Sequence, residues 1–185
     1  MTRNMILSIV AITALLSGCG EKASDTPSGV AANTAASDPT LASGWTKPDA
    51  CAVVDKATFA AVVGVPVSTS ELRMVHPADG STAATSECVF TLEDGGRYSL
   101  MLRWSPINDN TEGAINTMRS GLVAVMKGFG GTVEEVQSVG KAAFWVDKTS
   151  SLNVFIGEDR LAVINMPGGA TAKEKAITLA RKLGA

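Results

Sequence analysis

A few polar residues in this chain have types and spacings that could support chemistry. Ser138 and Lys141 have the Ser-x-x-Lys spacing, in which a lysine activates a serine hydroxyl when both lie on one helical turn. Here a glycine lies between them in a predicted strand-to-strand turn, which opposes that geometry, and the Ser-Asp-Asn and Lys-Thr-Gly partner motifs are absent. The single histidine, His76, lies in a polar segment, and the chain has no nucleophile elbow. We therefore interpret His76 as a solvated loop residue.

Acidic residues form two small groups. Glu134 and Glu135 are adjacent on a predicted strand, so their side chains point to opposite faces and do not form the carboxylate pair of a glycosidase. Asn108, Asp109 and Glu112 offer oxygen atoms for calcium, but they lack the alternating spacing of an EF-hand. They fit the start of a helix, where acidic groups lie near the positive dipole end. We predict no catalytic residues, no bound metal and no cofactor.

The N-terminal residues suggest a different chemistry. An apolar run from Met5 to Leu16 has the length of a secretory h-region and is too short to cross a bilayer as a helix. The motif Leu16-Ser17-Gly18-Cys19 closes this run. The pattern resembles the signal peptides of bacterial lipoproteins, which implies cleavage after Gly18 and attachment of lipid to Cys19. The alternative is an ordinary secretory peptide that is cut nearby, with Cys19 incidental.

The same resemblance implies a location and a domain organisation. Gly20 follows the cysteine where an aspartate would signal inner-membrane retention, so in a Gram-negative source we expect the outer membrane, facing the periplasm. Residues 1–18 are the expected signal peptide. Residues 19–44 are the expected lipidated cysteine and flexible linker, because small polar residues bury too little surface to offset their ordering entropy. Residues 45–185 are the expected single folded domain.

Two cysteines remain if lipid consumes Cys19. Cys51 and Cys88 would then be an even pair in an oxidising compartment, which predicts a disulfide. Closing a loop of about 38 residues would stabilise the fold by about 4 kcal/mol in the chain-entropy model. A redox or metal-binding pair is the alternative. However, the chain has no Cys-x-x-Cys spacing, and its one histidine leaves a zinc site short of ligands.

The apolar patterning predicts an α+β domain, with an antiparallel sheet of about five to seven strands and three helices packed on it. We expect helices at residues 55–63, 111–128 and 171–183. We expect strands at residues 87–93, 98–104, 133–139, 142–146, 152–156 and 161–166. The irregular, polar residues 68–86 are expected to be mostly loop, with at most a short strand at 71–75. The element order also suggests two loosely related helix-plus-sheet units.

Several short motifs resemble those of a class of small bacterial lipoproteins of unknown function. These motifs are Cys51-Ala-Val-Val-Asp55, Glu87-Cys88-Val-Phe90, Val139-Gly140-Lys-Ala-Ala-Phe144-Trp145, Leu152-Asn-Val-Phe-Ile156-Gly157 and Leu179-Ala-Arg-Lys-Leu183. They consist of core and turn residues. The resemblance therefore implies a fold and a disulfide, and it brings no catalytic residues.

One apolar set is a candidate interaction surface. Strand alternation predicts that Met101, Trp145, Phe155 and Ile164 lie together on the sheet face opposite Leu100 and its neighbours. Two interpretations remain open. In one, a helix or the loop before Cys88 covers this face and makes it core. Alternatively, it is an open surface that meets a protein partner, a second copy or a lipid-like ligand.

Charge and composition narrow the function classes. The chain has 16 basic and 18 acidic side chains, with a formal net charge of −2 and no block of one sign, so we expect no nucleic-acid partner. The expected function is a lipid-anchored, non-enzymatic binding or accessory module of the cell envelope, held to the membrane through its N-terminal lipid. An envelope hydrolase with an unrecognised polar site is the alternative.

Overall fold

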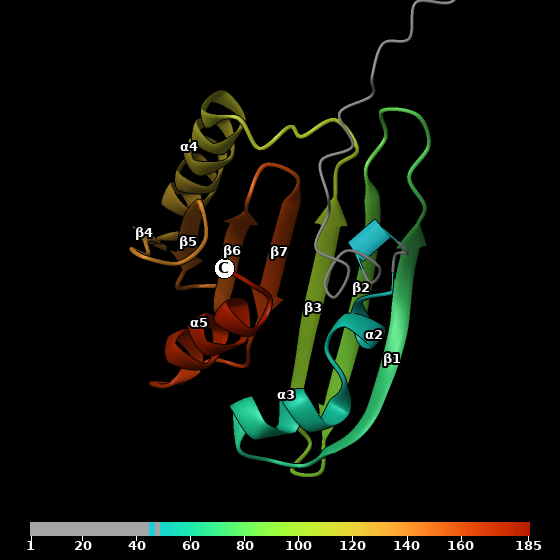
Figure 1. The fold of residues 1–185 in the computed structure, drawn as a ribbon. Coiled ribbons are helices and arrows are strands. Elements are labelled where there is room, and N and C mark those ends of the chain that lie inside the picture. Colours follow the sequence, from blue (N-terminus) through green and yellow to red (C-terminus); the bar gives the residue numbers. More distant parts are fainter. Residues whose placement is uncertain (1–44, 47–48) are drawn as a thin grey trace, which may run out of the picture. The chain divides into compact units, whose positions relative to one another are not determined.

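Seven antiparallel strands form one sheet in the computed structural model, which describes residues 45–46 and 49–185 (Figure 1). The strands are β1 (Val67–His76), β2 (Ala84–Leu92), β3 (Arg97–Trp104), β4 (Val133–Glu135), β5 (Ala142–Val146), β6 (Ser151–Ile156) and β7 (Arg160–Asn165). The helices are α2 (Ala50–Val53), α3 (Lys56–Val63), α4 (Glu112–Phe129) and α5 (Ala172–Lys182). The predicted α+β class is therefore confirmed, and the short helix α2 is an addition to the three helices predicted.

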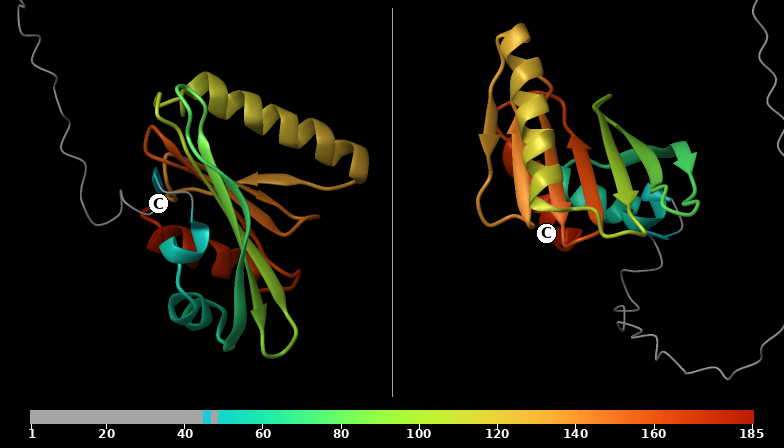
Figure 2. Two further views of the ribbon diagram at one scale, coloured as in Figure 1. Left: turned by 90° about the vertical axis from the view of Figure 1, so that its right-hand side faces the viewer. Right: turned by 90° about the horizontal axis from the view of Figure 1, so that it is seen from above.

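The strand order is β1-β2-β3-β7-β6-β5-β4. The last strand in the sequence, β7, therefore lies at the centre of the sheet, beside β3. Helices α2, α3 and α5 lie on one face of the sheet, and α4 lies on the other (Figure 2). The expected strands at the C-terminal half form an antiparallel meander, β4 to β7, as predicted. Strand β4 is shorter than expected, since it ends at Glu135.

The main core lies between the sheet and the layer of α2, α3 and α5. Phe59 of α3 stacks on Phe90 of β2 with ring centroids 4.0 Å apart, and both side chains are fully buried. Leu179 and Leu183 bring the C-terminal segment into the same cluster. A smaller cluster under α4 contains four buried side chains: Ile115, Phe144, Phe155 and Leu161. This cluster is smaller than the main core because α4 buries only two of its side chains, Ile115 and Met126.

Local sequence signals explain where the helices begin and end. Asp55 caps α3 as predicted, because its carboxylate accepts a hydrogen bond of 2.7 Å from the backbone N–H of Thr58. Thr111 caps α4 in the same way, through Ala114. Helix α4 ends at Gly130, which has a left-handed conformation that glycine adopts without steric cost.

The predicted disulfide is present. Cys51 of α2 and Cys88 of β2 are bonded, with Cα atoms 5.0 Å apart. Cys88 is fully buried in the main core, whereas Cys51 is half-buried. The bond therefore joins the helical layer to the buried face of the sheet.

The prediction that residues 68–86 are mostly loop is wrong. Ten residues from Val67 to His76 form the edge strand β1, and β2 already begins at Ala84. The sequence signal was weak because nearly all of β1 is exposed, so it lacks alternating apolar residues. Two register shifts, between Val67 and Thr69 and between Leu72 and Met74, also break the alternation. Such bulges are common at sheet edges, where they discourage pairing with other chains.

The prediction that four apolar residues share one sheet face is also wrong. Directly paired residues point to the same face, and the pairs Leu100–Ile164, Ile164–Leu152 and Leu152–Trp145 place Ile164 and Trp145 on the α5 side. Met101 lies on the opposite side, because it is adjacent to Leu100 on β3.

Phe155 also lies on the α4 side, in the small cluster. The error arose because the alternation of side chains between the two faces was extended from one strand to the next. The length of each turn decides which face the next strand's side chains occupy. Trp145, Phe155 and Ile164 are buried and Met101 is half-buried, so the four residues form no common open surface.

Candidate binding site

Helix α4 covers only part of its sheet face. Its buried side chains contact Phe144 of β5, Phe155 of β6 and Leu161 of β7. Among the residues that the structure describes, no helix lies over β1, β2 and β3 on this face (Figure 2). The side of α4 that faces these strands therefore meets the uncovered part of the sheet at an open junction.

A hollow of about 190 Å³ lies at this junction, between the first half of α4 and the sheet. Phe155 and Leu161 form its floor, and they are only 3% and 4% exposed. Ala114 and Met118 form the wall on the α4 side. The hollow thus has an apolar interior built from three separate elements.

A charged pair lies at the rim of the hollow. The guanidinium of Arg103 on β3 donates two hydrogen bonds to the carboxylate of Asp109, one of them 3.0 Å long. This hydrogen bonding holds the pKa of Asp109 below its usual range, while partial burial acts in the opposite direction. Asp109 therefore stays ionised at neutral pH, and the rim carries both charges.

Hydrogen bonds from Asn110 and Lys141 fix the loop that leads into α4. The Asn110 side chain is 1% exposed and donates to the backbone carbonyls of Gly157 and Arg160. Lys141 donates to the backbone carbonyl of Asn110 at 2.8 Å and pairs with Glu158 at 2.6 Å. These bonds connect the α4 start to the β4–β5 and β6–β7 turns, so the wall of the hollow is held in place.

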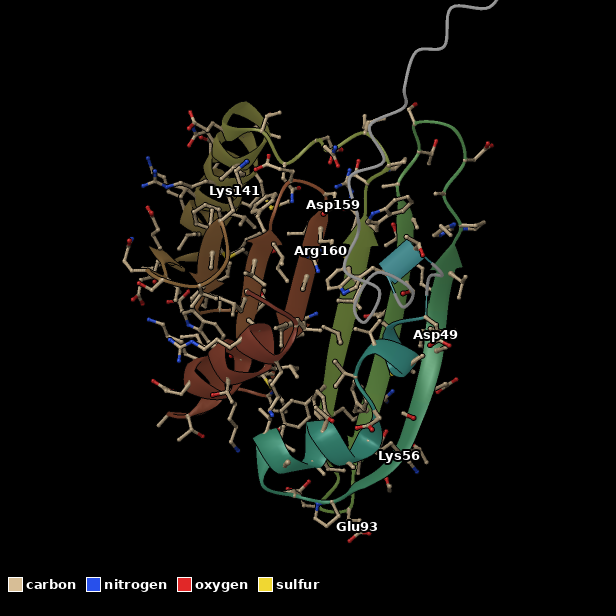
Figure 3. All side chains as sticks on the ribbon, viewed as in Figure 1. Asp49, Lys56, Glu93, Lys141, Asp159 and Arg160 are labelled. Atoms are coloured by element: carbon tan, nitrogen blue, oxygen red, sulfur yellow. A yellow bond between two sulfur atoms is a disulfide. The ribbon has the colours of Figure 1, made fainter. Side chains whose placement is uncertain are left out.

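The same end of the sheet contains a second polar group (Figure 3). Trp104 donates an indole N–H hydrogen bond of 3.0 Å to Asp159, which also pairs with Arg160 at 3.5 Å. The Arg160 guanidinium lies 5.5 Å from the ring centre of Trp45, which is 3% exposed. These contacts anchor the beginning of the described domain to the β6–β7 turn.

A larger hollow of about 610 Å³ lies at the opposite end of β3. It is wide open and is lined by the β2–β3 turn, Tyr98, Ser99, Asn165 and Pro167. The side chain of Asn165 already donates to Ser99 at 2.9 Å. The smaller hollow is the better candidate for a ligand, because two buried side chains, Phe155 and Leu161, form its floor, whereas the larger hollow is a wide-open surface depression.

Comparison with known proteins gives no family for this chain. No family model matches it, and no significant match was found among curated proteins or solved structures. The candidate site therefore depends on the geometry of this chain alone.

The sequence identified only part of the hollow. Phe155 was named as a surface candidate, and Asp109 was named as a residue at a helix start. Arg103, Met118 and Leu161 were missed, because the hollow combines strands and a helix whose contacts do not follow from local pattern. The available signal was that a single helix is too narrow to cover one face of a seven-stranded sheet.

The residues considered for catalysis lie in different places and have other partners. The ammonium of Lys141 is held by Glu158 and the carbonyl of Asn110, and Ser138 is an exposed turn residue with φ of +62°. His76 is exposed at the end of the edge strand β1.

The acidic candidates are also engaged. Glu134 pairs with Lys173, and Glu135 lies 4.0 Å from Arg119. Asp109 accepts hydrogen bonds from Arg103 as described above. In the described part of the chain, no group of three or more histidine, cysteine, aspartate or glutamate side chains is arranged to hold a metal ion.

Cys19 and the expected signal peptide and linker lie outside the described residues. Within residues 45–46 and 49–185, no helix combines the length and apolar character needed to cross a membrane.

Proposed function

We propose that this chain is a non-enzymatic accessory protein of a bacterial cell envelope, held to a membrane by lipid on Cys19. In this proposal, its folded domain binds an apolar side chain of a protein partner in the hollow beside α4. The motif that ends at Cys19 supports the anchor. The disulfide between Cys51 and Cys88 supports an oxidising compartment. In a Gram-negative source, Gly20 favours the outer membrane, with the domain in the periplasm.

The observation that carries the binding proposal is the concave apolar floor of Phe155 and Leu161 beside a charged rim. Apolar pockets with a few fixed polar groups are the usual form of binding sites. An apolar cavity of about 150 Å³ holds benzene, so a hollow of about 190 Å³ has room for one aromatic ring or branched side chain.

The size of the hollow favours a protein side chain over a free ligand. Sites that bury a drug-sized molecule typically have about 300 Å³ or more. The rest of any larger ligand would therefore lie outside the hollow, on the uncovered part of β3 and β7. A partner segment that inserts one side chain and lies along these strands fits this shape.

The binding test uses toluene as a probe for an inserted ring. The ε-methyl NMR signal of Met118 should shift in a saturable manner as toluene is added, because Met118 lines the hollow. Ala114→Trp should abolish the shift by filling the hollow. Asn116→Trp is the matched control, because Asn116 is exposed and lies on the other flank of α4. A shift that is absent, or equal in both variants, would reject the site.

A photo-crosslinking amino acid at position 114, used in intact cells, then tests for a protein partner. One defined adduct should form at position 114 and not at position 116. The anchor is tested separately by incorporation of labelled fatty acid, which Cys19→Ser should eliminate. An unlabelled parent protein would reject the anchor and leave the binding test unaffected.

A further inference from the structure

The last two turns of α4 expose an unusual amount of apolar surface. Val123, Val125 and Phe129 are 47%, 53% and 73% exposed. Val125 and Phe129 are four residues apart and lie on one side of the helix, whereas Val123 lies on the opposite side. Val125 and Phe129, together with Lys127 between them, are called the α4 tip below. Phe129 is the most exposed of the large apolar side chains in the described residues.

The α4 tip is not part of the core of this domain. The side chain that anchors this part of the helix is Met126, which is 8% exposed. The helix ends at Gly130, and the turn to β4 lies at the periphery of the domain, away from β1 (Figure 2). The tip therefore projects from the domain, and exposing Phe129 to water has no evident structural benefit.

The charges around the α4 tip are suited to an anionic surface. After Glu112, helix α4 has no acidic residue, and it carries Arg119 and Lys127. Lys127 forms no ion pair with a carboxylate in the part of the chain that the structure describes. Lys148 lies beside Gly131, directly after the helix.

The nearest acidic side chains are already engaged. Asp147 accepts hydrogen bonds from the backbone and hydroxyl of Thr132 and from the backbone of Lys148, and these bonds lower its pKa. Glu134 and Glu135 face lysine and arginine partners, as described above. Asp147 stays negatively charged, and Lys148 beside it offsets that charge. Among the described residues, Lys127 is therefore the cation at the end of α4 that has no carboxylate paired with it.

We propose that the α4 tip inserts into the interfacial region of an anionic lipid bilayer. Apolar side chains entering the headgroup and acyl boundary, with lysine directed to the headgroups, are typical of interfacial helices. The inference rests on the proposed lipid anchor for its physiological setting. An anchored lipid on Cys19 would hold the domain at the membrane surface, so a weak contact suffices.

The experiment measures cosedimentation with vesicles of equal parts phosphatidylglycerol and phosphatidylethanolamine. The protein is the chain from residue 19 with Cys19→Ser, which has no acyl group and retains every described residue. Phe129→Ser should lower the partition coefficient at least fivefold. Ile107→Ser is the matched control, because Ile107 is 57% exposed and precedes α4, and it should leave partitioning unchanged. Lys127→Gln should weaken binding to these vesicles and not to phosphatidylcholine vesicles.

The outcomes decide whether the α4 tip contacts a lipid bilayer or another protein. No binding by the parent, or equal binding by the parent and Phe129→Ser, overturns the inference. Self-association that requires Phe129, without vesicle binding, overturns it in favour of a protein contact. Melting temperatures of all variants should agree within error, because the substituted side chains are exposed. If Cys19 is not acylated in cells but the vesicles still bind through Phe129, the proposed anchor fails and this inference stands.

Discussion

The side-chain amide of Asn110 donates a hydrogen bond of 2.8 Å to the backbone carbonyl of Arg160. Asn110 lies just before α4, whereas Arg160 begins β7, so one buried amide connects the start of the helix to the centre of the sheet. The wall of the candidate site at Ala114 is only one helical turn away. The position of this wall, and so the shape of the hollow, therefore depends on the Asn110 hydrogen bonds.

Asn110→Ala should lower the free energy of unfolding by about 1–3 kcal/mol. The substitution leaves two partly buried carbonyl groups, those of Gly157 and Arg160, without this donor. Chemical denaturation of the parent and the variant measures the change. Asn116→Ala, on the exposed side of α4, is the control and should not destabilise the fold. Equal losses in the two variants would show that the Asn110 bonds contribute little.

Gly140→Ala should destabilise the domain by more than about 1 kcal/mol. Gly140 has φ of +61°, and a Cβ atom there would overlap the backbone carbonyl of Phe155. Gly121→Ala is the control, because Gly121 lies inside α4 with open space around the new atom. That change should stabilise the domain by about 0.5–1 kcal/mol, since alanine favours helix. If thermal melts show that both substitutions shift the melting temperature in the same direction, the different roles given to Gly140 and Gly121 are wrong.

Removal of the disulfide should lower the free energy of unfolding by about 2–4 kcal/mol. The bond between Cys51 and Cys88 closes a loop with a sequence separation of 37 and so restricts the unfolded chain. The variant is Cys51→Ala with Cys88→Ala, compared by denaturation with a parent that carries Cys19→Ser. A reducing agent should lower the melting temperature of the parent and leave the double variant unchanged. A parent insensitive to reduction would mean that the bond contributes nothing measurable.

Local patterns predicted much of this fold because they depend on neighbouring residues. Asp55 and the following apolar spacing located α3, and the Asp-Gly-Gly turn located the β2–β3 hairpin. The edge strand β1 was missed because an exposed strand needs no apolar alternation. Cysteine parity predicted the disulfide, since it requires no knowledge of three-dimensional contacts.

The candidate site was far less predictable. Trp145 and Phe144 are adjacent, and only the pairing of β5 with β6 decides which of them faces α4. The extent of sheet that a helix leaves uncovered depends on where the connecting loop places it. For α4, that loop is held by Asn110, and its long-range hydrogen bonds have no local sequence signature.

The Asp109 carboxylate should make stability depend on pH in the acid range. Hydrogen bonding from Arg103 lowers the pKa of Asp109 in the folded state below its usual value of 3.8. A carboxylate with a lowered folded pKa contributes stability that is fully present above the unfolded pKa and is lost as the pH falls through the folded pKa. Between about pH 5 and about pH 3, the melting temperature of the parent should therefore fall more than that of Asp109→Asn.

Glu93→Gln is the control for this measurement, because Glu93 is an exposed carboxylate in the β2–β3 turn (Figure 3). Arg103 lies near the other end of β3. The melting temperature of Glu93→Gln should fall on acidification by as much as that of the parent. If Asp109→Asn loses as much stability on acidification as the parent, the ion pair at the rim does not stabilise the folded state. The partner variant Arg103→Gln should reproduce the flatter profile, since the low pKa of Asp109 depends mainly on that guanidinium.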